Sequence, residues 1–100
     1  MLKKDKAWKL FKLKKFTEAQ KLILEIIEKD EDDINLINLY ALCSQHLRNF
    51  KEAYNYFIKA YKIKEDHLET LKNLGNFYFQ CEDYYQAEIN YKKFLFYSPE

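Results

Sequence analysis

Residues 68–99 read LETLKNLGNFYFQCEDYYQAEINYKKFLFYSP, and this stretch decides the fold. Apolar and small residues recur in it at steps of three and four, first at Leu71, Leu74, Gly75 and Tyr78 and then at Tyr84, Ala87, Tyr91, Phe94 and Leu95. That spacing is typical of one apolar stripe on an α-helix. The polar residues 80–83 lie between the stripes, as a short helix–helix connection does. The stretch therefore predicts helices over 68–80 and 85–97, with Asp83 as an N-cap and Pro99 after the last helix.

The same pattern occurs three times at a spacing of 34 residues. The markers are Phe16-Thr17-Glu18-Ala19, Phe50-Lys51-Glu52-Ala53 and Tyr84-Tyr85-Gln86-Ala87, each preceded by a small residue at Ala7, Ala41 or Gly75. We expect Gly75 or Ala41 to face Ala87 or Ala53, because small side chains let two helix backbones cross closely. The earlier units predict helices over 2–13, 17–29, 34–46 and 51–63, with Asn49 as a further N-cap. Amphipathic helix pairs of this kind must stack to cover their apolar faces.

The composition excludes several classes of protein. One Gly and one Pro in 100 residues are too few for an all-β chain, whose turns need many of both. A net charge of +1 gives no global field that would attract nucleic acid. No apolar run approaches the roughly 18 residues of a membrane span. The two cysteines form no disulfide pattern, so we expect a reducing compartment and a cytoplasmic location.

The repeated unit resembles the tetratricopeptide repeat (TPR). The third unit carries Leu71, Leu74, Gly75, Tyr78, Ala87, Tyr91 and Pro99 at the signature positions, with Leu71 in place of the usual Trp and Tyr91 in place of the usual Phe. The second unit has Ser44 and Glu65 at the Tyr and Pro positions, and the first unit departs furthest. The resemblance implies an all-α, right-handed solenoid of three antiparallel helix pairs. It also implies a single domain over 1–100 with repeats at 1–33, 34–67 and 68–100, which we expect to be part of a longer protein or an assembly.

The resemblance further implies a non-catalytic protein–protein interaction module that acts as a scaffold or adaptor. In this family the first helix of each pair lines a concave groove, which binds a peptide or a helix of a partner protein. The matching groove positions are Lys4, Trp8, Phe11, Asn35, Asn38, Leu42, Gln45, Asn73, Asn76 and Phe79, with His46 and Gln80 beside them. Asn side chains suit an extended peptide because each offers a donor and an acceptor to backbone amides. Phe11 is equally consistent with packing inside the first pair.

One binding mode of the family is not expected here. Chaperone-binding members grip a partner's terminal carboxylate with Lys and Asn on the first groove helix, Asn on the second, and Lys plus Arg on the third. The matching residues are Lys4, Trp8, Leu39, Glu69 and Asn73, and only Lys4 fits. Glu69 would repel a carboxylate. We therefore expect a partner that is not a carboxylate-clamp chaperone ligand.

The last helix offers an alternative interaction surface. Its aromatic and apolar residues are Tyr91, Phe94, Leu95, Phe96 and Tyr97, which surround it nearly completely. An exposed apolar patch of that size usually has a partner. The alternative function is therefore an assembly module that self-associates or docks another subunit through its C-terminal face. A further alternative is the targeting domain of a larger enzyme.

The basic first segment has two readings. Residues 1–15 carry seven Lys against Asp5, whereas residues 16–33 carry two Lys against seven acidic residues. Two antiparallel helices with attracting solvent edges explain this pattern, although exposed pairs contribute only about 0–1 kcal/mol each. The lysines also alternate with Leu2, Trp8 and Leu13, as in peptides that lie on anionic membranes. We favour a solvated capping face, because the repeat uses part of that apolar stripe for packing.

The sequence predicts no enzyme activity, cofactor or metal. Cys43 and Cys81 lack metal-ligand spacing, so we expect buried, unreactive thiols. Cys43 and His46 share a helix but have no third group to orient them. Residues 30–33 lack the Gly and the spaced Glu of a calcium loop, and we expect them to cap the next helix. His67 lies in a connection, where we expect it to be solvated.

Overall fold

The computed structural model describes residues 2–29 and 32–98, and within these ranges the chain forms six α-helices and no strand. The helices are α1 (Lys3–Lys12), α2 (Phe16–Ile27), α3 (Ile34–His46), α4 (Phe50–Ile63), α5 (Leu68–Gln80) and α6 (Tyr84–Tyr97). All six predicted helices are confirmed, and each predicted end lies within two residues of the observed one. Pro99 lies outside the described residues.

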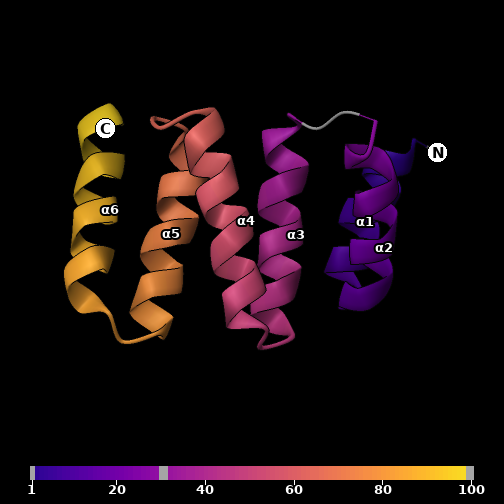
Figure 1. Ribbon diagram of the computed structural model, residues 1–100, viewed down its shortest axis with the longest axis horizontal. Helices are drawn as coiled ribbons and strands as arrows, with labels where there is room; N and C mark the ends of the chain where they lie inside the picture. Colours follow the sequence, from indigo (N-terminus) through magenta and orange to yellow (C-terminus); the bar gives the residue numbers. More distant parts are fainter. Residues whose placement is uncertain (1, 30–31, 99–100) are drawn as a thin grey trace.

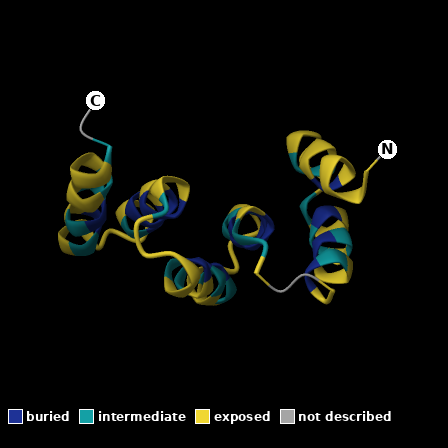
Figure 2. Ribbon diagram, turned by 90° about the horizontal axis from the view of Figure 1, so that it is seen from above, coloured by how far each residue is buried: buried dark blue, intermediate teal, exposed yellow. Residues whose placement is uncertain are grey.

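The helices form a stack of three antiparallel pairs. The pairs are α1–α2, α3–α4 and α5–α6, and each packs on the next through α2–α3 and α4–α5. They stand side by side in a row with the chain ends at opposite sides (Figure 1), within an envelope of 37 × 24 × 22 Å. Seen from above, the row is curved, with α3 between α1 and α5 (Figure 2). Contacts of α3 with both α1 and α5 place the first helices of the pairs along one side.

The core lies between the pairs as well as within them. One buried cluster joins Ala7 of α1 and Ile23 and Ile27 of α2 to Leu36, Leu39 and Tyr40 of α3. A second cluster joins Ala41 of α3 and Ala53 and Phe57 of α4 to Leu74 and Phe77 of α5. Dark-blue buried segments accordingly lie where helices face their neighbours (Figure 2). A single pair could not cover these apolar faces, so stacking is what builds the core.

Gly75 makes room for an aromatic ring. A Cβ atom at this position would lie 2.4 Å from a ring carbon of Tyr91, and its three nearest neighbours would all be atoms of that ring. The expectation that Gly75 faces Ala87 is therefore incomplete, because Tyr91 of α6 fills the space above the glycine. The Tyr91 hydroxyl also donates a hydrogen bond of 2.5 Å to Oδ1 of Asn76. These contacts fasten α6 to α5.

Substitution Gly75→Ala is expected to destabilise the protein by about 1 kcal/mol or more, because overpacking against the Tyr91 ring outweighs the helix propensity that alanine gains. In a Tyr91→Ala background the same substitution should stabilise by up to about 1 kcal/mol, since only the propensity gain remains. Urea unfolding of the four proteins measures both effects. Destabilisation in both backgrounds would show that the ring is not what excludes a side chain at Gly75.

The three turns inside the helix pairs share one backbone geometry. Lys14, Arg48 and Glu82 all adopt positive φ, at 62°, 63° and 63°, and lie 34 residues apart. In the first turn the Lys15 amide donates to the Leu10 carbonyl and the Lys14 amide to the Phe11 carbonyl, and the same pair of bonds recurs in the other two turns. This is the Schellman motif, which ends a helix with a left-handed residue and usually uses glycine there.

Substitution Lys14→Gly or Glu82→Gly should therefore stabilise the protein, by about 0.5–1 kcal/mol each, because glycine adopts the left-handed conformation without a steric cost. The control is Lys9→Gly, at an exposed position inside α1, where glycine should destabilise by about 1 kcal/mol. Equilibrium unfolding in urea measures all three values. Loss of stability at all three positions would contradict the turn argument.

Side-chain caps are present at some of the predicted helix starts. Asp33 Oδ1 accepts a hydrogen bond of 3.1 Å from the Leu36 amide, and Asp83 Oδ1 accepts one of 3.2 Å from the Gln86 amide. Both caps confirm the prediction, although residues 30 and 31 of the acidic run lie outside the described ranges. Asn49 stands at the start of α4 but its side chain makes no capping bond, so that prediction is wrong. Backbone bonds of the preceding Schellman turn already position this residue.

Candidate peptide-binding groove

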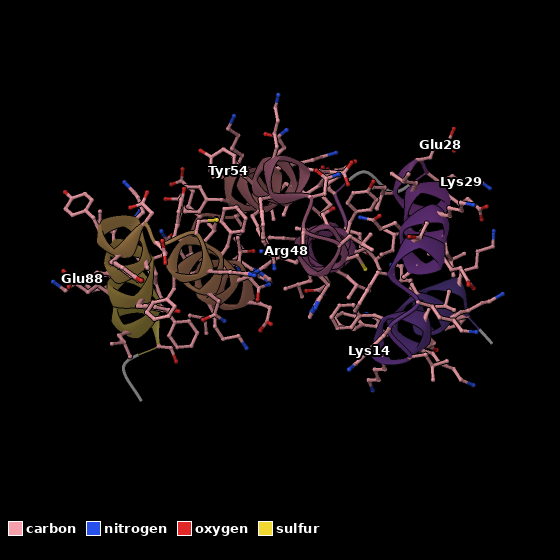
Figure 3. All side chains as sticks on the ribbon, turned by 90° about the horizontal axis from the view of Figure 1, so that it is seen from below. Lys14, Glu28, Lys29, Arg48, Tyr54 and Glu88 are labelled. Atoms are coloured by element: carbon pink, nitrogen blue, oxygen red, sulfur yellow. The ribbon has the colours of Figure 1, made fainter. Side chains whose placement is uncertain are left out.

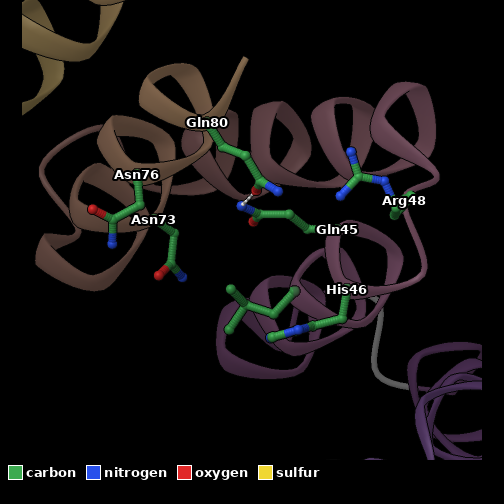
Figure 4. A pocket seen from close by; sticks show the side chains of 7 residues that line it. Gln45, His46, Arg48, Asn73, Asn76 and Gln80 are labelled. Carbon is green, nitrogen blue, oxygen red and sulfur yellow. Dashed lines mark hydrogen bonds between the residues drawn. The ribbon is translucent and has the colours of Figure 1, made fainter. Parts of the chain in front are cut away.

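A pocket of about 300 Å³ opens between α3 and α5. Its lining residues are Leu42, Gln45, His46, Arg48, Asn73, Asn76 and Gln80. Gln45 and Gln80 reach toward each other across the pocket and are joined by an amide–amide hydrogen bond (Figure 4). The structure thus brings together Leu42, Gln45, Asn73 and Asn76, which the sequence placed in the groove, with His46 and Gln80 beside them.

Arg48 is a pocket residue that the sequence analysis missed. It lies in the turn after α3, whereas the groove was assigned to helices alone. Its guanidinium lies 5.1 Å from the centroid of the Phe50 ring, which is within the range of a cation–π contact. The sequence did contain one indication of Arg48, because it is the single arginine in a chain with sixteen lysines.

Two of the predicted groove residues lie beneath the surface. Asn38 and Asn73 are 2% and 4% exposed, and Nδ2 of Asn73 donates to Oδ1 of Asn38 at 3.2 Å. Nδ2 of Asn38 donates in turn to Oγ1 of Thr70 at 2.8 Å and to the Ile34 carbonyl at 3.1 Å. The interpretation of Asn38 as a groove-surface residue is therefore wrong, because its amide is used to join α3 to α5. Asn73 belongs to the same bonded layer and still lines the pocket.

His67 lies at the end of this buried layer. We expected a solvated side chain here, and that prediction is wrong. It is half-buried at the start of α5, where Nδ1 accepts a hydrogen bond from the Thr70 amide at 3.3 Å and lies 2.8 Å from Thr70 Oγ1. An accepting Nδ1 carries no proton, so the cap requires neutral imidazole. Burial, with a smaller contribution from Lys64, lowers the pKa of His67 below its ordinary 6.5, against opposing effects of Glu69 and Asp66.

Because the pKa of His67 is lowered, the stability of the protein should depend on pH. Well above pH 6.5 His67 is neutral in both the folded and the unfolded chain, so the cap contributes fully. As the pH falls through 6.5, the unfolded chain binds the proton first, so the free energy of unfolding decreases. Substitution His67→Asn keeps a capping acceptor without a titrating group. The free energy of unfolding of the wild type should fall more than that of the variant between about pH 7.5 and pH 5.5. Equal losses would contradict a cap that depends on neutral imidazole.

The first pair supplies an aromatic wall beside the pocket. Phe16 stacks on His46 with ring centroids 4.6 Å apart, and Phe11 packs edge-on against both rings. Phe11 is half-buried and packs against the first core cluster, so its contacts agree with packing inside the stack and not with a free groove surface. Trp8 is 39% exposed and packs edge-on against Phe11, which leaves part of the indole available.

The two remaining predicted groove residues, Lys4 and Asn35, do not line the pocket between α3 and α5. Lys4 forms an ion pair of 2.6 Å with Asp33, which joins α1 to the start of α3. A second, exposed pair of 4.0 Å between Lys3 and Glu25 agrees with the expected attraction between the first two helices. Asn35 is exposed in the first turn of α3.

Phe79 lies on a different surface from the one expected. It is 59% exposed, but it packs edge-on against Tyr84 and lines a mostly apolar pocket of about 300 Å³ at the C-terminal end of the stack. Leu95, Phe96 and Tyr97 are exposed on α6, as the sequence indicated for that face. Tyr91 and Phe94 are half-buried, and Tyr91 contacts both Asn76 and the Gly75 backbone. The exposed face is therefore smaller than predicted.

The cysteines differ from each other. Cys43 is fully buried, and burial raises the pKa of its thiol to about 12. Cys81 is exposed, so the expectation of two buried thiols is wrong, because α5 ends one residue before it. Within residues 2–29 and 32–98 no cluster of His, Cys, Asp and Glu could hold a metal ion. None of the helices in those ranges combines the length and the hydropathy that crossing a membrane requires.

The fold matches known TPR structures. No protein-family model matches the sequence, and no curated protein is significantly similar to it. Among solved structures, the first TPR of Spaghetti (RPAP3) bound to the HSP90 peptide SRMEEVD is 21% identical with a TM-score of 0.89, over 98% of this chain and 78% of that one. The second TPR of the same protein, bound to the same peptide, is 17% identical with a TM-score of 0.84, over 94% and 87%. A MamA RS-1 double mutant is 15% identical with a TM-score of 0.89. The match covers 97% of this chain, which spans only 55% of the length of the MamA chain. The chain has the tetratricopeptide-repeat fold.

Proposed function

We propose that this chain is a protein–protein interaction module that holds a peptide or a helix of a partner protein in the groove along α1, α3 and α5, as a scaffold or adaptor. The observation that carries the proposal is the pocket between α3 and α5, into which amide side chains from two different repeats converge. Amide groups can both donate to and accept from a peptide backbone, whatever its sequence. Peptide binding by the similar Spaghetti repeats supports the same function.

The proposal does not include a carboxylate clamp. Of the five matching positions, Leu39 is fully buried and Asn73 is engaged beneath the surface. Glu69 pairs with Lys72 at 3.3 Å and keeps a negative charge where the clamp needs a positive one. A partner that binds along the groove through internal residues fits these positions better than one held by its terminal carboxylate.

The C-terminal face supports the alternative, an assembly module. Leu95 and Phe96 are 61% and 76% exposed beside the apolar pocket lined by Phe79 and Tyr84. A contact there would join this chain to a second copy or to another subunit. The targeting domain of a larger enzyme remains a further alternative, in which the same groove would select the enzyme's substrate or location. We further propose a cytoplasmic, non-catalytic role without cofactor, nucleic acid or membrane.

Partner capture with two matched variants tests the groove. The groove variant carries Trp8→Ala, Gln45→Ala and Gln80→Ala, which leaves the buried Asn38 layer intact; the end-face variant carries Leu95→Ser and Phe96→Ser. Both are compared with the wild-type chain as baits in lysate of the source organism, after circular dichroism confirms their helix content. Because three contacts of about 1 kcal/mol each are removed, the groove variant should retain its partners at least about tenfold less well.

The two variants separate the proposed functions. Partners lost from the groove variant alone support recognition in the groove. Partners lost from the end-face variant alone would contradict it and assign the interaction to α6. Partners retained by both would contradict both surfaces.

A further inference from the structure

We propose that the pocket between α3 and α5 binds the carboxylate of an aspartate or glutamate side chain in the partner peptide, and that Arg48 is the cation that pairs with it. This inference rests on the proposed function, because the acidic residue belongs to a peptide held in the same groove. It adds a chemical preference that the amide side chains alone would not give.

The lining of the pocket is suited to an anion. It combines the Arg48 guanidinium and the His46 imidazole with four side-chain amides, and the residues that line it include no carboxylate. Arginine offers several N–H groups in a planar fork that matches a carboxylate. The amide groups of Gln45, Asn76 and Gln80 supply further donors, while Leu42 provides an apolar contact for the methylenes of the bound side chain.

Arg48 is available for such a ligand. No ion pair involves it among the described residues, and its side chain is exposed beside the Phe50 ring. Its backbone is held by the Schellman turn, where the Arg48 amide donates to the Gln45 carbonyl at 3.0 Å. The turn therefore places the residue that carries the cation at the pocket, through backbone bonds that a ligand need not disturb.

Three acidic side chains near the groove have partners within the protein. Asp33 pairs with Lys4 and Glu69 with Lys72. Glu52, which follows Arg48 on α4, accepts a hydrogen bond of 2.8 Å from Ser44 Oγ and one of 3.5 Å from Gln20 Nε2. These carboxylates therefore have their own donors, and none of them lines the Arg48 pocket.

The end of the molecule around Arg48 adds positive charge. Lys12, Lys14, Lys15 and Lys51 are exposed near the first two turns, and the stacking of Phe16 on His46 brings the first turn close to the end of α3. Viewed from below, Lys14 and Arg48 lie at neighbouring turns (Figure 3). Glu18 and Glu52, in the first turns of α2 and α4, oppose part of this charge, and Glu82 occupies the third turn, so the positive excess lies at the first two turns. Exposed charges of this kind steer an acidic ligand, while the pocket residues bind it.

Proton–nitrogen NMR spectra of the wild-type chain test the inference with two capped probes, acetyl-SAEAS-amide and its glutamine counterpart acetyl-SAQAS-amide. Neither has a free carboxyl terminus, so the glutamate side chain is the only anion. At concentrations up to about 10 mM, which detect a dissociation constant of about 1 mM, the glutamate probe should shift the side-chain amide signals of Gln45, Asn76 and Gln80. The glutamine probe should bind at least about tenfold more weakly.

Two variants show whether the cation must be Arg48. Arg48→Met should reduce binding of the glutamate probe to the level of the glutamine probe. Lys14→Met is the matched control, because it removes a positive charge from the same left-handed position of the preceding turn, outside the pocket. It should leave the preference for glutamate within about twofold of the wild type, since exposed charges at a distance are screened.

These results decide the Arg48 site alone. Equal binding of both probes, or equal losses in the two variants, would overturn the Arg48 site while leaving a peptide-binding groove. Absence of any shift at the highest concentration would also overturn the Arg48 site. The broader function is decided separately by partner capture with the groove variant, which retains Arg48.

Discussion

The fold depends on close approach of the two helices in each pair, which completely buried small residues make possible. Ala7, Ala19, Ala41 and Ala53 are all 0% exposed. Larger side chains there would push the backbones apart and break the stacking that covers the apolar faces. In the third pair the small residue is Gly75, and the Tyr91 ring occupies the space that a side chain at this position would need. Tyr91 therefore joins α6 to α5 both through this ring and through its bond to Asn76, beside the contact of Phe79 with Tyr84.

Polar layers between the pairs then fix their relative positions. Gln20 of α2 donates to Ser44 of α3 at 2.7 Å, and Ser44 donates to Glu52 of α4, so three helices share one bonded cluster. The buried amides of α3 and α5 form the corresponding layer between the second and third pairs. Among the described residues no buried side-chain polar atom lacks a partner. A shifted stack would leave such atoms unpaired at about 1–3 kcal/mol each, so hydrogen bonding selects a single arrangement from those that apolar packing would accept.

Helix spans and pairing were predictable from the sequence because both follow from the spacing of apolar residues, which repeats every 34 positions. The three left-handed turns were not, since Lys14 and Arg48 occupy positions where glycine is the usual signal. Asn38 was assigned to the groove because its position matches a groove-facing position of the tetratricopeptide repeat. Its burial depends on Thr70, a partner 32 residues away that no local pattern identifies. Ser44 departs from the repeat signature, and only the contacts of Gln20 and Glu52 explain it.

The buried layer also determines what the groove can recognise. The bond between Asn38 and Asn73 joins α3 to α5, so the helices that carry the pocket side chains are positioned before any ligand binds. A peptide that bound there would have to order exposed side chains but would not have to rearrange the helices. The bond between Gln45 and Gln80 is exposed, and a ligand that offers the amides new partners replaces it at small net cost, since such bonds contribute about 0.5–1.5 kcal/mol. Such amides impose little sequence preference on the proposed peptide ligand. In the proposal, selectivity therefore comes from the one lining group with a fixed charge, which is Arg48.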